Sequence, residues 1–169
     1  MSELGIPYFP MFVNLESKQV VVFGAGKIAF RRIQTLLLFH ASIVVIARDI
    51  SKDAQEGMKR LIKTGQIRFV QKEFEEEDMT MGIDIVIAAT DDSGLNEVIY
   101  DLCKERKIII NVATNPQLCD FYFPAVAMQD GIIIGITGNG QNHKKVLETA
   151  KEIRKYLENT TDESDLPIS

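Results

Sequence analysis

The chain lacks the features that mark several classes of protein. It has no tryptophan, and its two cysteines, Cys103 and Cys119, are not spaced as metal ligands. We therefore expect reduced thiols in an intracellular protein and no metal site. No apolar run approaches the roughly 18 residues that span a bilayer, and no basic flank leads into a long apolar core at the N-terminus. These absences predict a cytoplasmic protein with no membrane partner and no secretory signal.

The chain also lacks an excess or a cluster of positive charge. The formal net charge is −5, and no run of Lys and Arg is longer than two residues. A nucleic-acid surface needs a basic patch or stripe, so we expect no nucleic-acid partner. Apolar residues, in contrast, make up 46% of the chain, which suffices for a core. A length of 169 residues predicts one domain with a modest appendage.

The most informative stretch is Val20–Ala29, in which an apolar strand pattern leads into Gly-Ala-Gly-Lys-Ile-Ala. This spacing fits the G-x-G-x-x-G/A pattern of dinucleotide-binding loops. Gly24 can adopt the angles of a tight strand-to-helix turn, and Gly26 lets a pyrophosphate approach the backbone. The helix that follows offers free N–H groups and a positive dipole end. We therefore expect cofactor contacts from Gly24, Gly26, Lys27 and Ile28.

Strand and helix patterns alternate from the first strand to Val112. Continuous apolar strands separated by helices of about a dozen residues predict right-handed βαβ units and a parallel sheet covered on both faces. The fold class is therefore α/β, a Rossmann-type sheet. The expected strands are Gln19–Phe23, Ile43–Ala47, Ile67–Val70, Ile83–Ala89 and Lys107–Val112. The first expected helix follows Gly26, and its inward residues are Ile28, Ala29, Ile33, Leu36 and Leu37. The second spans Ser51–Lys63, with Ser51 as its N-cap. The third spans Ser93–Arg106, and its inward residues are Leu95, Val98, Ile99 and Leu102.

The alternation of strand and helix patterns ends after Val112. Asp130-Gly131 between two β-rich runs predicts a hairpin outside the main sheet, and 144–158 has the spacing of an amphipathic helix. The apolar faces of the hairpin need a partner, which a second subunit would supply. The sequence thus predicts a dinucleotide-binding domain over 1–113, a hairpin dimerisation region over 114–143, and a C-terminal helix with a frayed tail over 144–169.

Polar residues that follow the strands should converge on one crevice, because ligands of such sheets bind beyond the carboxyl ends of the strands. Asp49 after the second strand favours NAD, through the ribose hydroxyls, whereas Arg48 could accept the 2′-phosphate of NADP. We favour NAD and leave the choice open. Thr90 and Asp91 follow the most apolar strand and could face the cofactor. The alternative is that this segment only caps the next helix, through Asp92 or Ser93. The acidic run 75–78 is interpreted as a solvated turn or short helix.

Several linked motifs resemble the precorrin-2 dehydrogenase family, the NAD-binding module of siroheme synthase. They are Tyr8-Phe9-Pro10, the glycine loop with Arg31-Arg32, 87–92 (Ile-Ala-Ala-Thr-Asp-Asp), Asn111-Val112 and 119–124 (Cys-Asp-Phe-Tyr-Phe-Pro). The resemblance implies oxidation of precorrin-2, a tetrapyrrole, to sirohydrochlorin with NAD, in a homodimer built around the hairpin region. Some members of the family also insert iron.

Two departures from the family pattern affect the catalytic assignment. Thr114 stands where the family has an aspartate proposed as the acid/base group, and a threonine hydroxyl does not titrate near neutral pH. Asp120 is a possible substitute. The family's turn after Thr137 is also altered, in 138–143. These departures keep two alternatives open: a non-catalytic dinucleotide- or tetrapyrrole-binding module, and a sirohydrochlorin ferrochelatase.

Overall fold

The structure is a computed structural model that describes residues 9–138 and 142–161. The chain forms two compact units, one over Val13–Tyr122 and one that joins residues 9–12 to the chain from Phe123 onward. Most of the expected frayed tail, and the centre of the altered turn at 138–143, lie outside the described residues. In this division 114–122 belongs with the sheet, and the three-part division expected from the sequence stays a prediction.

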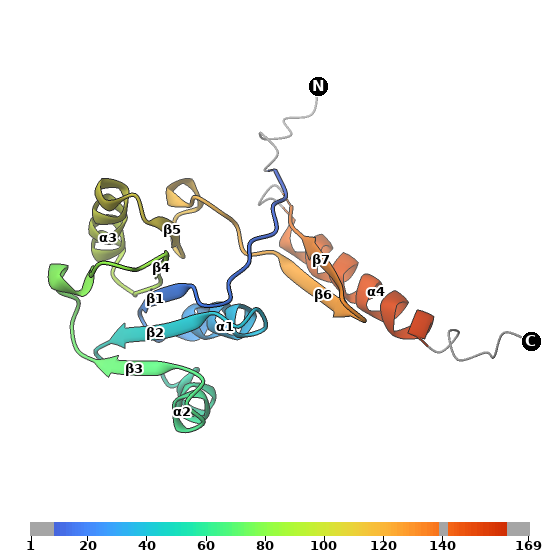
Figure 1. The fold of residues 1–169 in the computed structure, drawn as a ribbon, viewed down its shortest axis with the longest axis horizontal. Coiled ribbons are helices and arrows are strands. Elements are labelled where there is room, and N and C mark those ends of the chain that lie inside the picture. Colours follow the sequence, from blue (N-terminus) through green and yellow to red (C-terminus); the bar gives the residue numbers. More distant parts are fainter. Residues whose placement is uncertain (1–8, 139–141, 162–169) are drawn as a thin grey trace, which may run out of the picture. The chain divides into compact units, whose positions relative to one another are not determined.

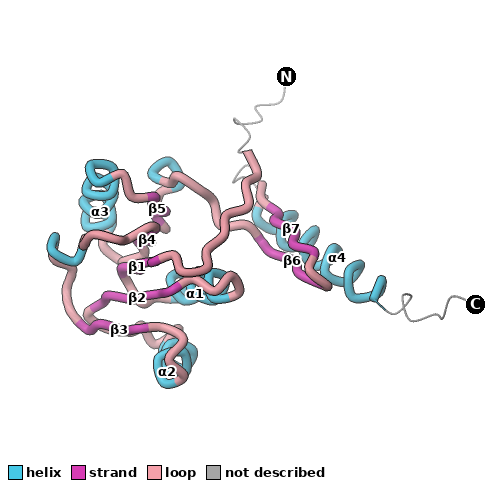
Figure 2. Tube along the Cα trace, in the orientation of Figure 1, coloured by secondary structure: helices cyan, strands magenta, loops and turns pink. Residues whose placement is uncertain are grey.

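The first unit is built on a parallel sheet of five strands in the order β3-β2-β1-β4-β5 (Figure 1). From β1 the strands β2 and β3 are added on one side of the sheet, and β4 and β5 are added on the other. This reversal of strand order gives a topological switch point between β1 and β4. Helices connect most strands, as the alternation of helix and strand in Figure 2 shows. The bounds are β1 Gln19–Phe23, α1 Lys27–Leu37, β2 Ser42–Ala47, α2 Gln55–Lys63, β3 Arg68–Gln71, β4 Ile85–Ala88, α3 Ser93–Arg106 and β5 Ile109–Val112, with short 3₁₀ helices at Glu76–Asp78 and Pro116–Leu118. The predicted α/β fold class is confirmed.

The core of this unit lies on both faces of the sheet. Successive side chains of β1 point to opposite faces, and Val20 to Phe23 are all buried. Val21 and Phe23 pack in one cluster with Ile99 and Cys103 of α3. Because parallel crossovers are right-handed, α1 and α2 cover the face opposite to α3. The continuous apolar runs of the sequence reflect this double burial.

Three details of the predicted helices are wrong. Helix α2 begins at Gln55 with Ala54 at its N-cap, because Ser51 instead belongs to the turn before the helix and donates its N–H to the Ala25 oxygen at 3.2 Å. Ile28 is about half exposed, since the first turn of α1 points that position toward the carboxyl edge of the sheet. Val98 is also half exposed, and the inward face of α3 is formed by Asn96, Ile99 and Cys103.

The second unit contains the predicted hairpin, β6 (Ala125–Gln129) and β7 (Ile132–Ile136), which forms a two-stranded antiparallel sheet of its own. Asp130 and Gly131 both have positive φ, as a two-residue hairpin turn requires. Helix α4 (His143–Thr161) packs on this sheet, with Ala127, Ala150 and Leu157 buried. Arg154 donates two hydrogen bonds to the Val126 oxygen, at 3.0 and 2.7 Å. In the part of the chain that the structure describes, no helix has the length and apolarity to cross a bilayer.

Candidate functional site

A cavity of about 690 Å³ lies at the carboxyl edge of the sheet, beyond the switch point. Its walls come from the segments that follow β1, β2, β3 and β4, which are far apart in sequence. The structure brings together at this cavity all eight residues that the sequence predicted as cofactor contacts. They are Gly24, Gly26, Lys27, Ile28, Arg48, Asp49, Thr90 and Asp91.

Gly24 makes the turn between β1 and α1 possible for two reasons. Its φ of +103° lies in a region that side chains strongly disfavour. A Cβ at this position would also lie 2.3 Å from the backbone oxygen of Ala89, at the end of β4. The Gly24 N–H donates to the Ile46 oxygen at 2.9 Å, so the loop is anchored to the neighbouring strand.

Gly26 has a different role. Its backbone is extended, with φ −88° and ψ −178°, and a Cβ there would meet no atom within 4 Å. Gly26 is the N-cap of α1 and offers no side-chain hydrogen bond to the first turn. The N–H groups of that turn therefore face open space at the positive end of the helix dipole, which suits a pyrophosphate. Ala29 is fully buried, so α1 packs closely on the sheet.

The segments after β2 and β3 form a rim of charged residues on the cavity. The strands are in register, and the Lys72 N–H donates to the Ala47 oxygen at 3.1 Å. The side chain of Gln71 donates to the Arg48 oxygen at 2.9 Å, which ties the two segments together. Arg48 lies 3.7 Å from the Glu73 carboxylate in an exposed ion pair. Asp49 lines the same rim.

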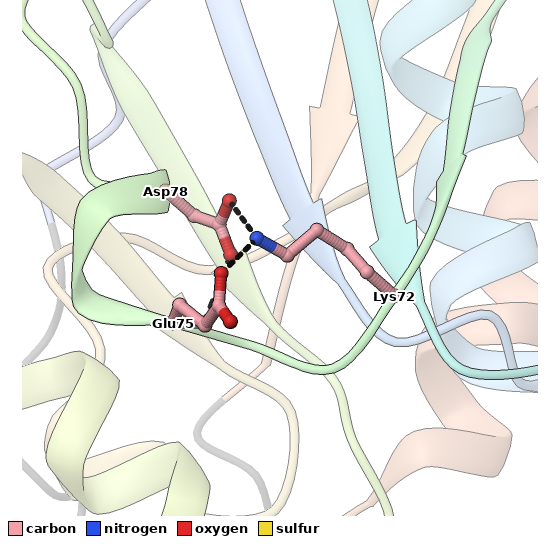
Figure 3. Close-up of polar contacts among 3 residues, drawn as sticks. All are labelled: Lys72, Glu75 and Asp78. Atoms are coloured by element: carbon pink, nitrogen blue, oxygen red, sulfur yellow. Dashed lines mark hydrogen bonds and ion pairs between the residues drawn. The ribbon is translucent and has the colours of Figure 1, made fainter.

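Lys72 is held between two carboxylates, Glu75 at 2.5 Å and Asp78 at 3.1 Å (Figure 3). The hydrogen bond to Glu75, followed by that to Asp78, raises the pKa of the Lys72 ammonium. Asp78 also accepts from the Glu75 N–H at 2.9 Å, as part of a capping box on the 3₁₀ helix. The acidic run is thus the short helix expected from the sequence. Among the described residues no group of three His, Cys, Asp or Glu is placed to hold a metal ion.

A buried amide connects two of the predicted site residues. Asn96 of α3 is fully buried, and its oxygen accepts from the Thr90 hydroxyl at 2.8 Å and from the Thr90 N–H at 3.2 Å. Its amino group donates to the Thr90 oxygen at 3.2 Å and to the Thr114 hydroxyl at 3.4 Å. The ends of β4 and β5 are therefore fixed to each other through one side chain. Asp92, with its side chain accepting from the Leu95 N–H, is the N-cap of α3.

Sequence reasoning missed Asn96. The available signal was a single amide at i−3 from Ile99 and i−7 from Cys103, on a helical stripe that is otherwise apolar. A buried polar side chain needs partners, so its position predicts a hydrogen-bonding role at the end of a neighbouring strand. The weak amphipathic pattern of this helix hid which face is inward.

The two candidate catalytic residues lie in different places. Thr114 follows β5 at the carboxyl edge, in contact with the Asn96 network. Neither residue lines the cavity. Asp120 pairs with Lys104, accepts from the Ile110 N–H at 3.0 Å, and donates its own N–H to the Ile110 oxygen. These bonds fix the segment after β5 to the edge strand β5 and to α3, so the structure gives Asp120 an anchoring role.

The two cysteines are not nucleophiles in this structure. Burial raises the pKa of the Cys103 thiol to about 12, and burial also raises the pKa of the Cys119 thiol. Both thiols are therefore protonated near neutral pH, and the thiolate is the reactive form. Cys119 donates to backbone oxygens of Val112 and Asn115.

Comparisons with known proteins agree with this geometry. A family described as putative NAD(P)-binding matches residues 11–125. The chain is 38% identical over 148 residues to a probable multifunctional siroheme biosynthesis protein of Ruminiclostridium josui, which covers 87% of this chain and 28% of that protein. It is 31% identical over 153 residues to the siroheme synthase of Ruthia magnifica, covering 90% of this chain and 30% of that protein. The chain thus spans less than a third of the length of these relatives.

Among solved structures, the chain is similar to one described as SirC, precorrin-2 dehydrogenase. The TM-score is 0.71 at 23% identity, and the alignment covers 91% of this chain and 76% of the other. At this identity the likeness establishes the shared fold.

Proposed function

Because the chain belongs to the putative NAD(P)-binding family and shares a segment with siroheme synthases, we propose that it catalyses the NAD-dependent dehydrogenation of precorrin-2 to sirohydrochlorin. The predicted cofactor class, a nicotinamide adenine dinucleotide, is confirmed by the family. The observation that carries the proposal is the convergence of the glycine loop and the polar strand ends on one cavity. The setting we propose is siroheme biosynthesis in the cytoplasm.

The residues present fit a dinucleotide. The open space at Gly26 and the uncapped first turn of α1 suit a pyrophosphate, which the N–H groups of 26–28 would hold. Asp49, two residues after β2, lines the cavity, which supports a role for its carboxylate in accepting hydrogen bonds from ribose hydroxyls and favours NAD over NADP. Lys27 adds a positive charge beside the phosphates.

The bound dinucleotide supplies a nicotinamide that accepts a hydride, so that precorrin-2 and NAD⁺ give sirohydrochlorin, NADH and a proton. The contribution of this chain is orientation at the end of β4 and β5. Asn96 fixes Thr90 and Thr114, and the Thr114 hydroxyl can hydrogen-bond a substrate group but has no titrating proton near neutral pH. The proton therefore leaves to water, and positioning supplies most of the rate gain.

We also propose a homodimer through the second unit. The face of the hairpin opposite to buried Ala127 carries the cross-strand pair Met128 and Ile133, and both side chains are more than a third exposed. Leu147 and Tyr156 of α4 are exposed as well. Such apolar residues on a small unit are typical of an interface.

The function is tested by mixing the chain anaerobically with precorrin-2 and NAD and following NADH formation. We expect NADH above the protein-free control, and a rise of about 10² to 10⁴-fold in rate for Thr114→Asp, which adds an acid/base group beside the Asn96 amide. The matched control is Thr80→Asp, the same change at an exposed position before β4 that does not line the cavity, which should leave the rate unchanged.

A second candidate is a dinucleotide- or tetrapyrrole-binding module without catalysis, and the observation that favours it is the threonine at position 114. NADH binding without any NADH formation from precorrin-2, in both the unsubstituted chain and Thr114→Asp, would establish this alternative and contradict the dehydrogenase. A ferrochelatase would instead insert iron into sirohydrochlorin without NAD.

A further inference from the structure

We propose that the acidic segment after β3 sets the choice of NAD over NADP, by pairing the two cations that would otherwise bind a 2′-phosphate. This inference rests on the proposed function, because it assumes a nicotinamide dinucleotide in the cavity. It assigns a role to Lys72, Glu73, Glu75 and Asp78, four residues outside the glycine loop and the end of β2.

The position of these residues follows from strand register. Ala47 at the end of β2 is paired with Gln71 at the end of β3, so Arg48 and Lys72 emerge side by side at the carboxyl edge. Both line the cavity together with Asp49. In sheets of this kind the end of β2 lies beside the ribose of the adenosine half of the cofactor. The 2′ position of that ribose is therefore expected between these two segments.

Two cations at this rim could form an NADP site, because Arg and Lys bind phosphate through charge-assisted hydrogen bonds. Each of them, however, already has an acidic partner. Lys72 is bonded to both Glu75 and Asp78 (Figure 3), and Arg48 lies beside Glu73. Glu75 and Asp78 do not line the cavity themselves, but they neutralise Lys72, which does. With Asp49 and Glu73 added, the segments after β2 and β3 hold two paired cations and four carboxylates, so their net charge is negative. A dianionic 2′-phosphate would meet net repulsion, whereas a 2′-hydroxyl can donate to Asp49.

The acidic partners of Lys72 are held more firmly in place than the acidic partner of Arg48. Asp78 is only 13% exposed at its side chain and is fixed by the capping box, so it cannot easily turn away from Lys72. Glu73 and Arg48 are both largely exposed, and their 3.7 Å contact is a weak one. Release of Lys72 from its partners should therefore raise the affinity for NADPH more than release of Arg48. The carboxylates of Glu75 and Asp78 together are the specificity-determining feature.

The test measures dissociation constants for NADH and NADPH by nucleotide fluorescence, which is free of tryptophan overlap since the chain has none. The unsubstituted chain should bind NADH at least about tenfold more tightly than NADPH. The double variant Glu75→Gln/Asp78→Asn keeps amide oxygens for the capping box but removes both charges. It should tighten NADPH binding about tenfold and leave NADH within about twofold, and adding Lys72→Gln should remove that gain.

The matched control is Glu77→Gln/Asp101→Asn, which changes the net charge equally at exposed positions that are not partners of Lys72 among the described residues. An equal gain in NADPH affinity in this control would overturn the inference, because net charge alone would then explain it. Equal affinity of the unsubstituted chain for NADH and NADPH would also overturn it while leaving the proposed function intact. If that chain binds neither nucleotide, the proposed function fails, and this inference fails with it.

Discussion

Gly24 and Gly26 are two positions apart, yet a side chain would be unfavourable at each of them for a different reason. At Gly24 the restriction is within the fold, because a Cβ would collide with the Ala89 oxygen and φ is strongly positive. At Gly26 the fold leaves space, and the backbone is one that any residue can adopt. The first glycine therefore serves folding, and we infer that the second serves the ligand.

Gly24→Ala should be strongly destabilising. A 2.3 Å approach to backbone atoms forces the loop or β4 to shift, and the positive φ adds strain, so we expect a loss of about 2–4 kcal/mol in the free energy of unfolding. Urea unfolding measures it. The control is Gly65→Ala, where φ is +71° but no atom lies within 4 Å, and the expected loss is about 1 kcal/mol. Equal losses in the two variants would contradict a steric role for the Ala89 contact.

At this scale the eight residues that the sequence predicted as cofactor contacts all line the cavity, because strand ends and glycine spacing determine which side chains reach the carboxyl edge, but Lys72 and Glu73 after β3 were not predicted. It did not predict the partners that those residues have inside the protein. The hydroxyl of Thr90 donates to Asn96, six residues further on, and Asp120 is bonded to Lys104 and to Ile110, which precede it by 16 and 10 residues. The amide of Asn96 on an apolar helical stripe indicates that it has a buried partner, but which group that partner is depends on tertiary packing.

At the scale of elements, the amino ends of β1 and β4 are joined by one carboxylate. Asp84 accepts from the Lys18 ammonium at 2.8 Å and from the Gln19 N–H at 2.9 Å. These bonds, first that to Lys18 and then that to Gln19, hold the pKa of Asp84 below its usual value. A carboxyl with a lowered pKa in the folded state stabilises the protein above its unfolded pKa, which is about 3.9.

We therefore expect Asp84→Asn to lower the free energy of unfolding at pH 7, and the difference from the unsubstituted chain to shrink as the pH falls below about 4. Urea unfolding across this pH range measures the difference. Asp101→Asn, at an exposed position on α3, is the control and should show little difference at any pH. A difference for Asp84→Asn that persists unchanged well below pH 4 would show that the ion pair is not its source.

The elements themselves were largely predictable, since apolar runs and glycines marked five strands and their helices. The predicted start of α2 was wrong because the chain first makes a turn, in which the Ala54 N–H donates to the Ser51 oxygen at 3.0 Å, and the helix begins after Ala54. The inward face of α3 was misassigned because the helix carries apolar residues on both sides, and burial of Asn96 selects one of them. Tertiary contacts decided the second case.

At the scale of the whole molecule, the proposed dimer predicts a solution mass of twice the chain mass by light scattering at micromolar concentration. The double variant Met128→Glu/Ile133→Glu places two charges on the exposed face of the hairpin and should give the mass of a single chain. Val98→Glu, at an exposed apolar position of α3 in the first unit, should leave the dimer intact. A monomeric unsubstituted chain, or dimers in the hairpin variant, would contradict the proposed interface.

The account as a whole depends on the dinucleotide lying against the loop at Gly26, and the most direct measurement is an NADH titration of Gly26→Ala with a parallel urea unfolding curve. Because the new Cβ would enter open space at an ordinary backbone conformation, the free energy of unfolding should stay within about 1 kcal/mol. NADH affinity should fall about tenfold or more, since the methyl group occupies the approach of the pyrophosphate. Unchanged NADH affinity in a folded Gly26→Ala variant would contradict the account.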